Sequence, residues 1–219
     1  MKTRDRILQT SLALFNAEGE ANVTTVDIAN EMDISPGNLY YHFKGKEEIV
    51  GNLFNTFDHE FQQILDAPAA GSLNSEDAWF YLYVVFEHIF NYRFLYRNIN
   101  DIMERYSGIN RQFRRLLFHK LDAADAISKE LIEKGIMVIP ENQRIRLCEN
   151  IALNLTFWLN YDQLRRQDMP NELLIHQAVF QIMSIVAPHL AEEFNGFYQE
   201  CATTYEELAA HILQKARES

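Results

Sequence analysis

The segment spanning residues 24–46 constrains the fold more than any other part of the chain, because it predicts two short helices joined by a tight turn. Thr24 or Thr25 can cap the first helix, and apolar residues follow at helical spacing. Ser35 is a favourable N-cap for the second helix, and Pro36 suits its first position, where a missing N–H costs nothing. The segment therefore predicts a helix-turn-helix unit.

The second of these helices has an inner and an outer side. We expect Leu39 and Phe43, four residues apart, to point into a small core together with Phe15 and Ile28. The outer side carries small, polar and aromatic residues, namely Gly37, Asn38, Tyr40, Tyr41 and His42. A helix of this kind can present its outer side to a groove.

This part of the chain resembles the DNA-binding domain of the TetR family of bacterial transcriptional repressors. The resemblance rests on LALFNAEG, TTVDIA, the turn DIS, the signature GNLYYHF and the following KGKEEI, all within residues 1–54. It implies an all-α fold with an N-terminal helix-turn-helix DNA-binding domain, expected over residues 1–50. A C-terminal helical ligand-binding and dimerisation domain is expected over residues 51–219. In this second domain only the length and the helical architecture fit the family.

The side chains of the helix-turn-helix divide by chemistry into two kinds of DNA contact. Hydroxyl, imidazole and ammonium groups donate to phosphate oxygens, whereas asparagine, tyrosine and a bare glycine can approach base edges in the major groove. The predicted phosphate contacts are Thr25, Tyr40, His42 and Lys46. The predicted groove contacts are Gly37, Asn38 and Tyr41. Ser35 and Pro36 complete the predicted site, and packing remains an alternative role for Tyr40 and His42.

The net charge is opposite to that of a general nucleic-acid binder. The chain has 20 Lys and Arg against 31 Asp and Glu, a formal net charge of −11. The first 50 residues hold five basic and eight acidic side chains. The five cations lie in the amino-terminal arm and around the second helix, so their placement, and not the total charge, predicts DNA binding. We expect binding to weaken sharply at high salt.

After residue 46 the chain consists of helical patterns, and nothing reads as a sheet. At 219 residues with 47% apolar content, the chain is long enough for a second, larger core. A helix over 46–65 would link the domains and carries Ile49, Leu53, Phe57, Phe61 and Leu65 on one face. Ser75 is expected to cap the next helix. Further helices are predicted over 94–106, 109–134, 141–167, 171–193 and 203–217.

The second part is rich in aromatic side chains. Pockets between helices are mostly apolar with a few polar anchors, but an aromatic stripe at helical spacing is more often solid core, so both interpretations stay open. The family resemblance implies a small organic effector that changes the separation of two DNA-reading heads. Arg93 and Arg97 could anchor a carboxylate or form an ordinary ion pair. The candidate ligand-binding residues are Trp79, Tyr83, Phe86, Phe90, Arg97, Phe113 and Trp158.

A homodimer is expected because one short recognition helix contacts only a few base pairs, and a two-fold dimer reads two half-sites. Two later helices carry apolar patterns that could form a four-helix interface between copies, or could be internal core. These patterns also include Ile145 and Cys148. The candidate interface residues are Ala152, Leu155, Leu159, Leu174, Ala178, Ile182 and Ile185.

The sequence gives no positive support for an enzyme, a metal site or a membrane span. None of the seven histidines belongs to a Glu-x-x-His pair, and there is no Cys-x-x-Cys, Gly-rich phosphate loop or nucleophile elbow. His189 with Glu192 and Glu193 could ligate a metal, although a solvated helix end is the simpler interpretation. Cys148 and Cys201 are expected to be thiols. No apolar run reaches about 18 residues.

We therefore predict a transcriptional repressor that binds a palindromic operator as a homodimer and is released by a small, largely apolar ligand. We expect no cofactor, and the amphipathic start predicts a cytoplasmic protein without a signal peptide. The alternative is a helical ligand-binding or scaffold protein whose N-terminal module makes protein contacts. An activator or a corepressor arrangement also stays open.

Overall fold

The computed structural model describes residues 2–67, 75–165 and 170–218. These residues form α-helices and short 3-10 turns, and they contain no strand beyond an isolated bridge between Met137 and Leu190. The predicted all-α class is confirmed. By its internal contacts the chain divides into two compact units, Met1–Gln62 with Asn91–Leu116 and Gln63–Phe90 with Leu117–Ser219. The domain boundary expected near residue 50 stays a prediction, since compact units need not coincide with domains.

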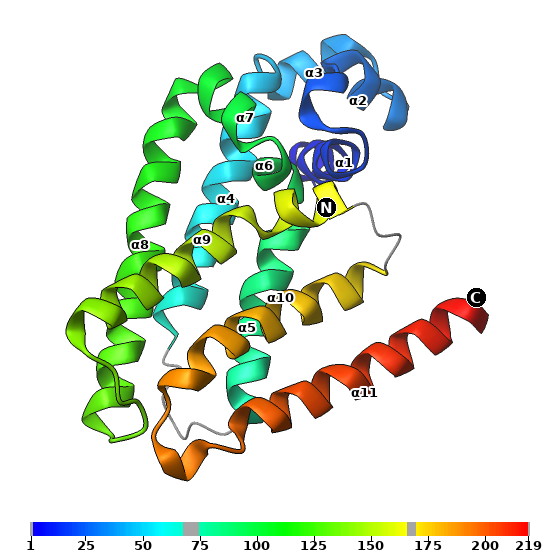
Figure 1. The fold of residues 1–219 in the computed structure, drawn as a ribbon. Helices are drawn as coiled ribbons and strands as arrows, with labels where there is room; N and C mark the ends of the chain where they lie inside the picture. The colour runs from blue at the N-terminus through cyan, green and yellow to red at the C-terminus, as the bar shows by residue number, and fades with distance from the viewer. Residues whose placement is uncertain (1, 68–74, 166–169, 219) are drawn as a thin grey trace. The chain divides into compact units, whose positions relative to one another are not determined.

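Figure 1 shows the helices in chain order. The first unit contains α1 (Thr3–Glu18), η1 (Glu20–Asn22), α2 (Thr25–Glu31), α3 (Pro36–His42), most of α4 (Lys46–Asp66), α6 (Arg93–Arg97), α7 (Ile99–Arg105) and the start of α8 (Ser107–Glu133). The second unit contains most of α5 (Ser75–Asn91), the rest of α8, α9 (Glu141–Arg165), α10 (Asn171–Val186), η2 (Ala187–His189), η3 (Glu192–Phe194) and α11 (Phe197–Glu218).

The core of the first unit lies beneath the two short helices, as the sequence predicts. Phe15, Ile28, Leu39 and Phe43 are all buried. One face of α4 adds the predicted apolar stripe, and the ring of Phe57 there is buried. The Phe57 ring lies 5.3 Å from that of Tyr92 and 5.7 Å from that of Tyr96, and burial of a phenylalanine side chain stabilises a fold by about 1.5–3 kcal/mol, so this stripe fixes α4 within the first unit.

Two predicted helices are broken in the structure. The segment 94–106 forms α6 and α7, which meet at Asn98, whose φ of −124° and ψ of 40° are not helical. The helix predicted over 171–193 ends at Val186, the last residue of α10. Pro188 explains the second break, because proline has no N–H to donate to the carbonyl oxygen of the preceding turn.

The last helix begins earlier than predicted. The pattern 203–217 lies within α11, which starts at Phe197. Phe197 and Cys201 are buried one turn apart, so the apolar face of α11 extends toward its amino end. The expected loop over 68–74 and the expected helix end at Gln167 lie outside the described residues. The structure places the start of α5 at Ser75 but does not describe that side chain.

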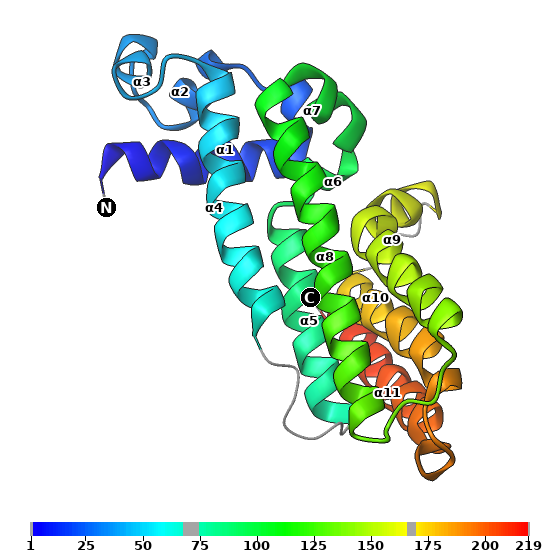
Figure 2. The same ribbon diagram turned by 90° about the vertical axis from the view of Figure 1, so that its left-hand side faces the viewer.

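In the second unit α10 packs against both α9 and α11 (Figure 2). Its buried residues include Leu173, Ile175, Ala178 and Val179, which point to different sides of the helix. A helix that is apolar all round is stable only when it is enclosed. Among the described residues, no helix has the length and apolar character needed to cross a bilayer.

Both cysteines lie in this unit as buried free thiols, as expected. Burial raises the pKa of Cys148, and burial with the nearby Glu200 carboxylate raises the pKa of Cys201 to about 11.

Candidate nucleic-acid interface and ligand cavity

The first helix of the predicted unit begins with a reciprocal cap. The Asp27 backbone N–H donates to Thr24 Oγ1 (3.2 Å), and the Thr24 backbone N–H donates to Asp27 Oδ2 (2.7 Å). The Thr24 hydroxyl also donates to Asp27 Oδ2 (2.6 Å), and this hydrogen bond together with the one from the Thr24 backbone N–H lowers the pKa of Asp27. After α2, the turn places Asp33 at a φ of 53°, a left-handed conformation that aspartate tolerates better than most residues. Local sequence chemistry thus sets the angle between α2 and α3.

Helix α3 begins and packs as its sequence predicts. Ser35 Oγ accepts a hydrogen bond from the Asn38 backbone N–H (3.2 Å), and proline occupies the first position. Leu39 is buried on the inner side, whereas Gly37, Asn38 and Tyr41 are exposed. The Tyr41 side chain is 85% exposed. The three residues predicted to enter a groove therefore lie on the outer side of α3.

The predicted phosphate contacts on α2 and α3 lie beside this face. Thr25 Oγ1 and the Tyr40 hydroxyl are 3.0 Å apart, and this hydrogen bond ties α2 to α3. The ring of Tyr40 is still half exposed. His42 is half-buried, with its ring edge-on to that of Tyr41 at 5.1 Å between centroids. Each of these polar groups can reach a surface placed against α3.

Lys46 has a structural role that the sequence did not reveal. Its Nζ donates to the carbonyl oxygens of Glu20 (2.9 Å) and Val23 (3.0 Å), and it forms an ion pair with Glu20 Oε1 (2.8 Å). These contacts tie η1 to the start of α4. The neighbouring Lys44 is exposed directly after α3 and was not among the predicted phosphate contacts. Lys44 is therefore better placed than Lys46 to meet a phosphate.

The Glu20 carboxylate is buried at the centre of a polar cluster in the first unit. Besides Lys46, it binds Arg105 Nη1 (2.6 Å) and accepts a hydrogen bond from the Tyr106 hydroxyl (2.5 Å). Burial and the Glu20 carboxylate raise the pKa of Tyr106, which therefore stays protonated. One carboxylate thus joins η1, α4 and the junction between α7 and α8.

A separate amide clasp holds α1 to the start of α6. Asn16 Nδ2 donates to the Asn91 carbonyl (2.8 Å), and Asn16 Oδ1 accepts from the Phe94 backbone N–H (3.0 Å). The Asn91 carbonyl and the Phe94 N–H lie where helical geometry is interrupted between α5 and α6. The Asn16 side chain therefore supplies the hydrogen bonds that a continuous helix would have made within its own backbone.

The second unit contains a cavity of about 120 Å³. Helices α5, α8, α9 and α10 contribute most of its lining. Among the described residues, the lining is apolar except for three with polar side chains, which are Tyr81, Lys120 and Ser128. A cavity of this composition suits a small, largely apolar molecule.

Lys120 is the one of these three that bears an amine. Its side chain is buried, and the residue is 2% exposed. Nζ donates to Thr156 Oγ1 (3.1 Å) and to the Leu155 carbonyl (3.4 Å). Burial lowers the pKa of Lys120 to about 7, because the charged amine loses its hydration.

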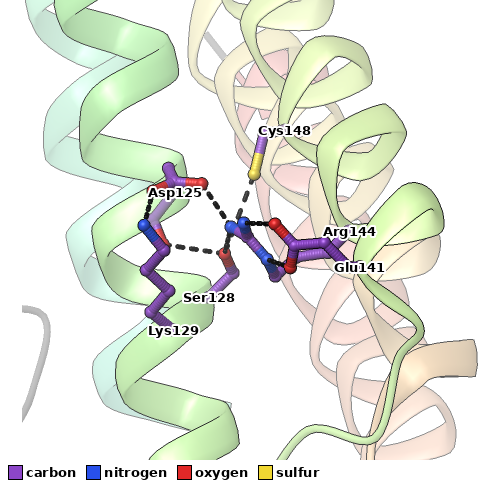
Figure 3. Close-up of polar contacts among 6 residues, drawn as sticks. All are labelled: Asp125, Ser128, Lys129, Glu141, Arg144 and Cys148. Carbon is purple, nitrogen blue, oxygen red and sulfur yellow. Dashed lines mark hydrogen bonds and ion pairs between the residues drawn. The ribbon is translucent and has the colours of Figure 1, made fainter.

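Ser128 connects the cavity to a buried arginine (Figure 3). Arg144 donates from Nε and Nη2 to the Glu141 carboxylate at 2.9 and 2.7 Å, and from Nη1 to Asp125 and to Ser128 Oγ. These hydrogen bonds raise the pKa of Arg144. Ser128 Oγ also lies 3.7 Å from Cys148 Sγ. The Arg144 cluster therefore clamps α8 to α9 beside the cavity wall.

Comparison with known proteins assigns both parts of the chain to one family. A model described as "bacterial regulatory proteins, tetR family" matches residues 7–53, and one described as "bacterial transcriptional repressor" matches residues 56–196. The chain belongs to the TetR family. It is therefore a TetR-family transcriptional regulator with a helix-turn-helix DNA-binding head, as the resemblance implied.

Individual TetR-family relatives agree with this assignment. A transcriptional regulator of the family from Marinobacter aquaeolei is 32% identical, with a TM-score of 0.81 over 94% of this chain and 98% of that one. The regulator QacR of Staphylococcus aureus is 30% identical over 59% of this chain and 71% of QacR. The probable regulator YttP of Bacillus subtilis is 24% identical over 62% of this chain, and the match spans 65% of YttP, slightly less than two thirds.

None of the seven predicted ligand-binding residues of this TetR-family regulator lines the cavity. The reason lies in the arrangement of α5. Trp79 Nε1 donates to His176 Nδ1 (3.1 Å), and the ring of Tyr83 lies 4.9 Å from that of His176, so the aromatic stripe packs against α10. Phe86 and Phe90 are buried in the same helix. The cavity is lined instead by the neighbouring stripe of α5, which is Ala78, Tyr81, Leu82 and Val85.

The other predicted ligand residues also have packing roles. Phe113 lies in the first unit, with its ring 4.9 Å from Phe54 and 5.9 Å from Tyr96. Arg97 is half-buried in α6 of the same unit. Trp158 is buried in α9, with its ring 5.6 Å from that of Tyr161. Large rings fill space, and the cavity forms where Ala78, Ala123 and Ala124 leave space unfilled.

The predicted dimer residues of this regulator correspond mostly to internal core. Six of the seven are buried within a single chain, namely Ala152, Leu155, Leu159, Leu174, Ala178 and Ile182, and Ile185 is half-buried. Leu155 and Ile182 line the cavity. A second copy has little of these side chains left to cover. The structure thus favours the internal-core alternative, because α11 and α9 already enclose α10.

Helix α9 exposes a different apolar stripe. Leu153, Phe157, Tyr161 and Leu164 recur at spacings of four, four and three residues, and each is more than 40% exposed.

Among the described residues no group of three or more His, Cys, Asp or Glu side chains is placed to hold a metal ion. His189 lies half-buried in η2, where its backbone carbonyl accepts from the Val138 N–H (2.9 Å).

Proposed function

We propose that this regulator represses transcription by binding a palindromic operator as a homodimer, and that a small, largely apolar ligand in the cavity releases it. The observation that carries the proposal is the outer side of α3, where Gly37, Asn38 and Tyr41 are exposed while Leu39 is buried on the inner side. Because these residues face outward, their polar and aromatic groups are accessible to a partner placed against α3.

In this proposal the exposed side of α3 enters the major groove. Asn38 can pair with an adenine edge, and the Tyr41 ring can contact a thymine methyl group. Thr25, Tyr40, His42 and Lys44 donate to phosphates on either side and set the register. Lys46 acts indirectly, because it holds η1 against α4 through Glu20 and the Val23 carbonyl.

The effector acts by differential affinity. A ligand can release DNA only if it binds more tightly to the chain conformation that no longer fits two successive half-sites. The apolar lining of the cavity supports a ligand of low polarity. Because the target of such a repressor is the chromosome, we place its action in the cytoplasm.

The operator is tested by selecting duplexes from a random pool with the full-length protein. We expect a palindromic winner, and we expect Tyr41→Ala to weaken its binding by about tenfold or more, since a lost base contact costs about 1–3 kcal/mol. Fluorescence anisotropy with wild type, Tyr41→Ala and the control Tyr198→Ala measures this. Tyr198 is also half exposed but lies on α11.

Salt gives a second readout of the same experiment. A plot of log affinity against log salt should fall steeply, because phosphate contacts release counterions. A nearly flat plot, or no enriched site at low salt, would move the assignment to a module that contacts protein instead of DNA.

The homodimer is tested on the exposed stripe of α9. We expect Leu153→Glu to yield a folded monomer with weak operator binding, because a carboxylate would be buried without a partner at the interface. Sedimentation velocity measures the association state. The matched control is Phe118→Glu, which places the same charge at an exposed apolar position of α8. If Leu153→Glu remains dimeric, the stripe is not the interface.

A further inference from the structure

Arg4, on the first turn of α1, has a guanidinium group held at a fixed place beside the end of α3. The guanidinium carbon lies over the ring of Phe43, 4.7 Å from the ring centroid, and Phe43 directly follows α3. Arg4 Nη2 also donates to Asn52 Oδ1 of α4 (2.7 Å). Because a guanidinium group is flat and stacks on an aromatic face, the stack and the hydrogen bond together fix its orientation.

Both anchors of Arg4 are themselves held by the fold. Phe43 is buried in the core of the first unit, and its backbone N–H donates to the Leu39 carbonyl (3.0 Å). Asn52 Nδ2 donates to the Glu48 carbonyl one turn earlier in α4 (2.7 Å). This hydrogen bond orients the Asn52 amide so that its oxygen faces Arg4. The position of the guanidinium group is therefore set before any partner binds.

The charge of Arg4 has no counter-ion within the described part of the chain. Its hydrogen-bond acceptor there is a neutral amide, and an aromatic ring attracts a cation without neutralising it. Arg4 is exposed, and a guanidinium group carries more N–H donors than this one hydrogen bond uses. The remaining donors are available to an anionic partner.

Lys44 adds a second cation to the same place. It follows Phe43 directly and is exposed. Its backbone N–H donates to Glu48 Oε2 (2.7 Å), which fixes the link between α3 and α4. Neither Arg4 nor Lys44 forms an ion pair with a described residue, although the whole chain has a formal net charge of −11. Two unpaired cations at the end of α3 fit the phosphates of a DNA strand.

On the basis of the proposed operator binding, we propose that Arg4 is a further contact to the DNA backbone, held ready by Phe43 and Asn52. Its flat guanidinium group donates two parallel hydrogen bonds to one phosphate, and Lys44 contacts the backbone beside it. Ordering a free side chain on binding costs conformational entropy, so a side chain ordered in advance binds more tightly. Asn52 is a positioning residue, because it acts through Arg4 and not on DNA.

The salt dependence of operator binding tests this contact. Arg4→Gln keeps a long polar side chain over Phe43 but removes the charge. With the full-length protein and the selected duplex, anisotropy should show binding weakened about fivefold or more. The slope of log affinity against log salt should become shallower by about 0.9, the value for one lost phosphate contact. Arg4→Lys should restore the slope, because it restores the charge.

The matched control is Arg6→Gln, which removes the same charge from another exposed position of α1. Residues two apart on a helix point to nearly opposite sides, so this variant should keep the slope of the wild type. Because phosphate contacts carry no sequence information, Arg4→Gln should weaken binding to the selected duplex and to a scrambled duplex by the same factor. A purely structural role of Arg4 would lower the thermal midpoint and leave the salt slope unchanged.

A double-mutant cycle tests the positioning role of Asn52. Asn52→Ala should weaken operator binding about threefold in the wild-type background and have no further effect in Arg4→Gln. An unchanged salt slope in Arg4→Gln, or equal losses for Asn52→Ala in both backgrounds, would overturn the inference. If the wild type still selects a palindromic duplex, operator binding then stands and only the role of Arg4 fails. If the wild type selects no duplex, the proposed function fails and this inference fails with it.

Discussion

Replacing Glu20 with alanine should destabilise the first unit by about 1–3 kcal/mol, because it leaves the buried Tyr106 hydroxyl without its acceptor and the partly exposed Lys46 and Arg105 without their shared carboxylate. The Glu20 carboxylate binds Lys46, Arg105 and the Tyr106 hydroxyl within 2.8 Å. Without it, the tie between η1, α4 and the junction of α7 with α8 is lost. Urea unfolding of the full-length protein, followed by circular dichroism, measures the change.

The matched control for this prediction is Glu18→Ala. Glu18 is two residues away in the chain and its side chain is exposed, so its removal should change the unfolding free energy by about 0.5 kcal/mol or less. Glu20→Gln should fall between the two, since an amide keeps a hydrogen-bond acceptor but loses the charge. Equal midpoints for Glu20→Ala and Glu18→Ala would show that the cluster does not hold the first unit together.

A second large effect is expected at Gly37, this time on DNA binding and not on stability. The conformation of Gly37 does not require a glycine, and a Cβ atom added there would meet only Ser35 Oγ, at 3.9 Å. Glycine is unfavourable inside a helix, so Gly37→Ala should stabilise the fold by about 0.5–1 kcal/mol. Operator affinity should nevertheless fall about tenfold for Gly37→Ala and about 100-fold for Gly37→Leu, because the backbone of α3 can no longer approach the base edges.

Gly51 provides the control for Gly37. It also lies in a helix, α4, and an added Cβ atom there meets nothing within 4 Å. Gly51→Ala should give the same gain in thermal midpoint with unchanged operator affinity. Parallel thermal scans and anisotropy titrations separate the two effects. If both alanine variants bind the operator normally, α3 does not approach DNA closely at residue 37.

The features that could be predicted are those set by neighbours in the sequence. The caps at Thr24 and Ser35 and the proline at the start of α3 act over three or four residues, so local chemistry is sufficient to place them. The inward position of Leu39 and the outward position of Tyr41 follow from helical periodicity. This locality explains why the outer side of α3 could be identified from the sequence, while its contact with DNA stays a prediction.

The features that were missed depend on residues distant in the sequence. The partners of Glu20 lie 26, 85 and 86 positions away, and no periodic pattern shows that they meet. The predicted ligand contacts on α5 lie on a stripe that packs against α10, and the cavity is lined by the neighbouring stripe, because periodicity identifies a buried face but not whether its side chains fill the space. The sequence features that could have indicated the cavity were three small residues, Ala78, Ala123 and Ala124, and a lysine on an otherwise apolar helix face.

The two buried thiols make this regulator suitable for measurements of distance in its unmodified form. Thiols react as thiolates, and burial raises the pKa of both Cys148 and Cys201, so both should react slowly with maleimides and methanethiosulfonates. A single added cysteine at an exposed site of α2, Asn30→Cys, can then carry a spin label without removal of the native cysteines. The separation between labels on two copies would report directly whether a ligand moves the DNA-reading heads apart.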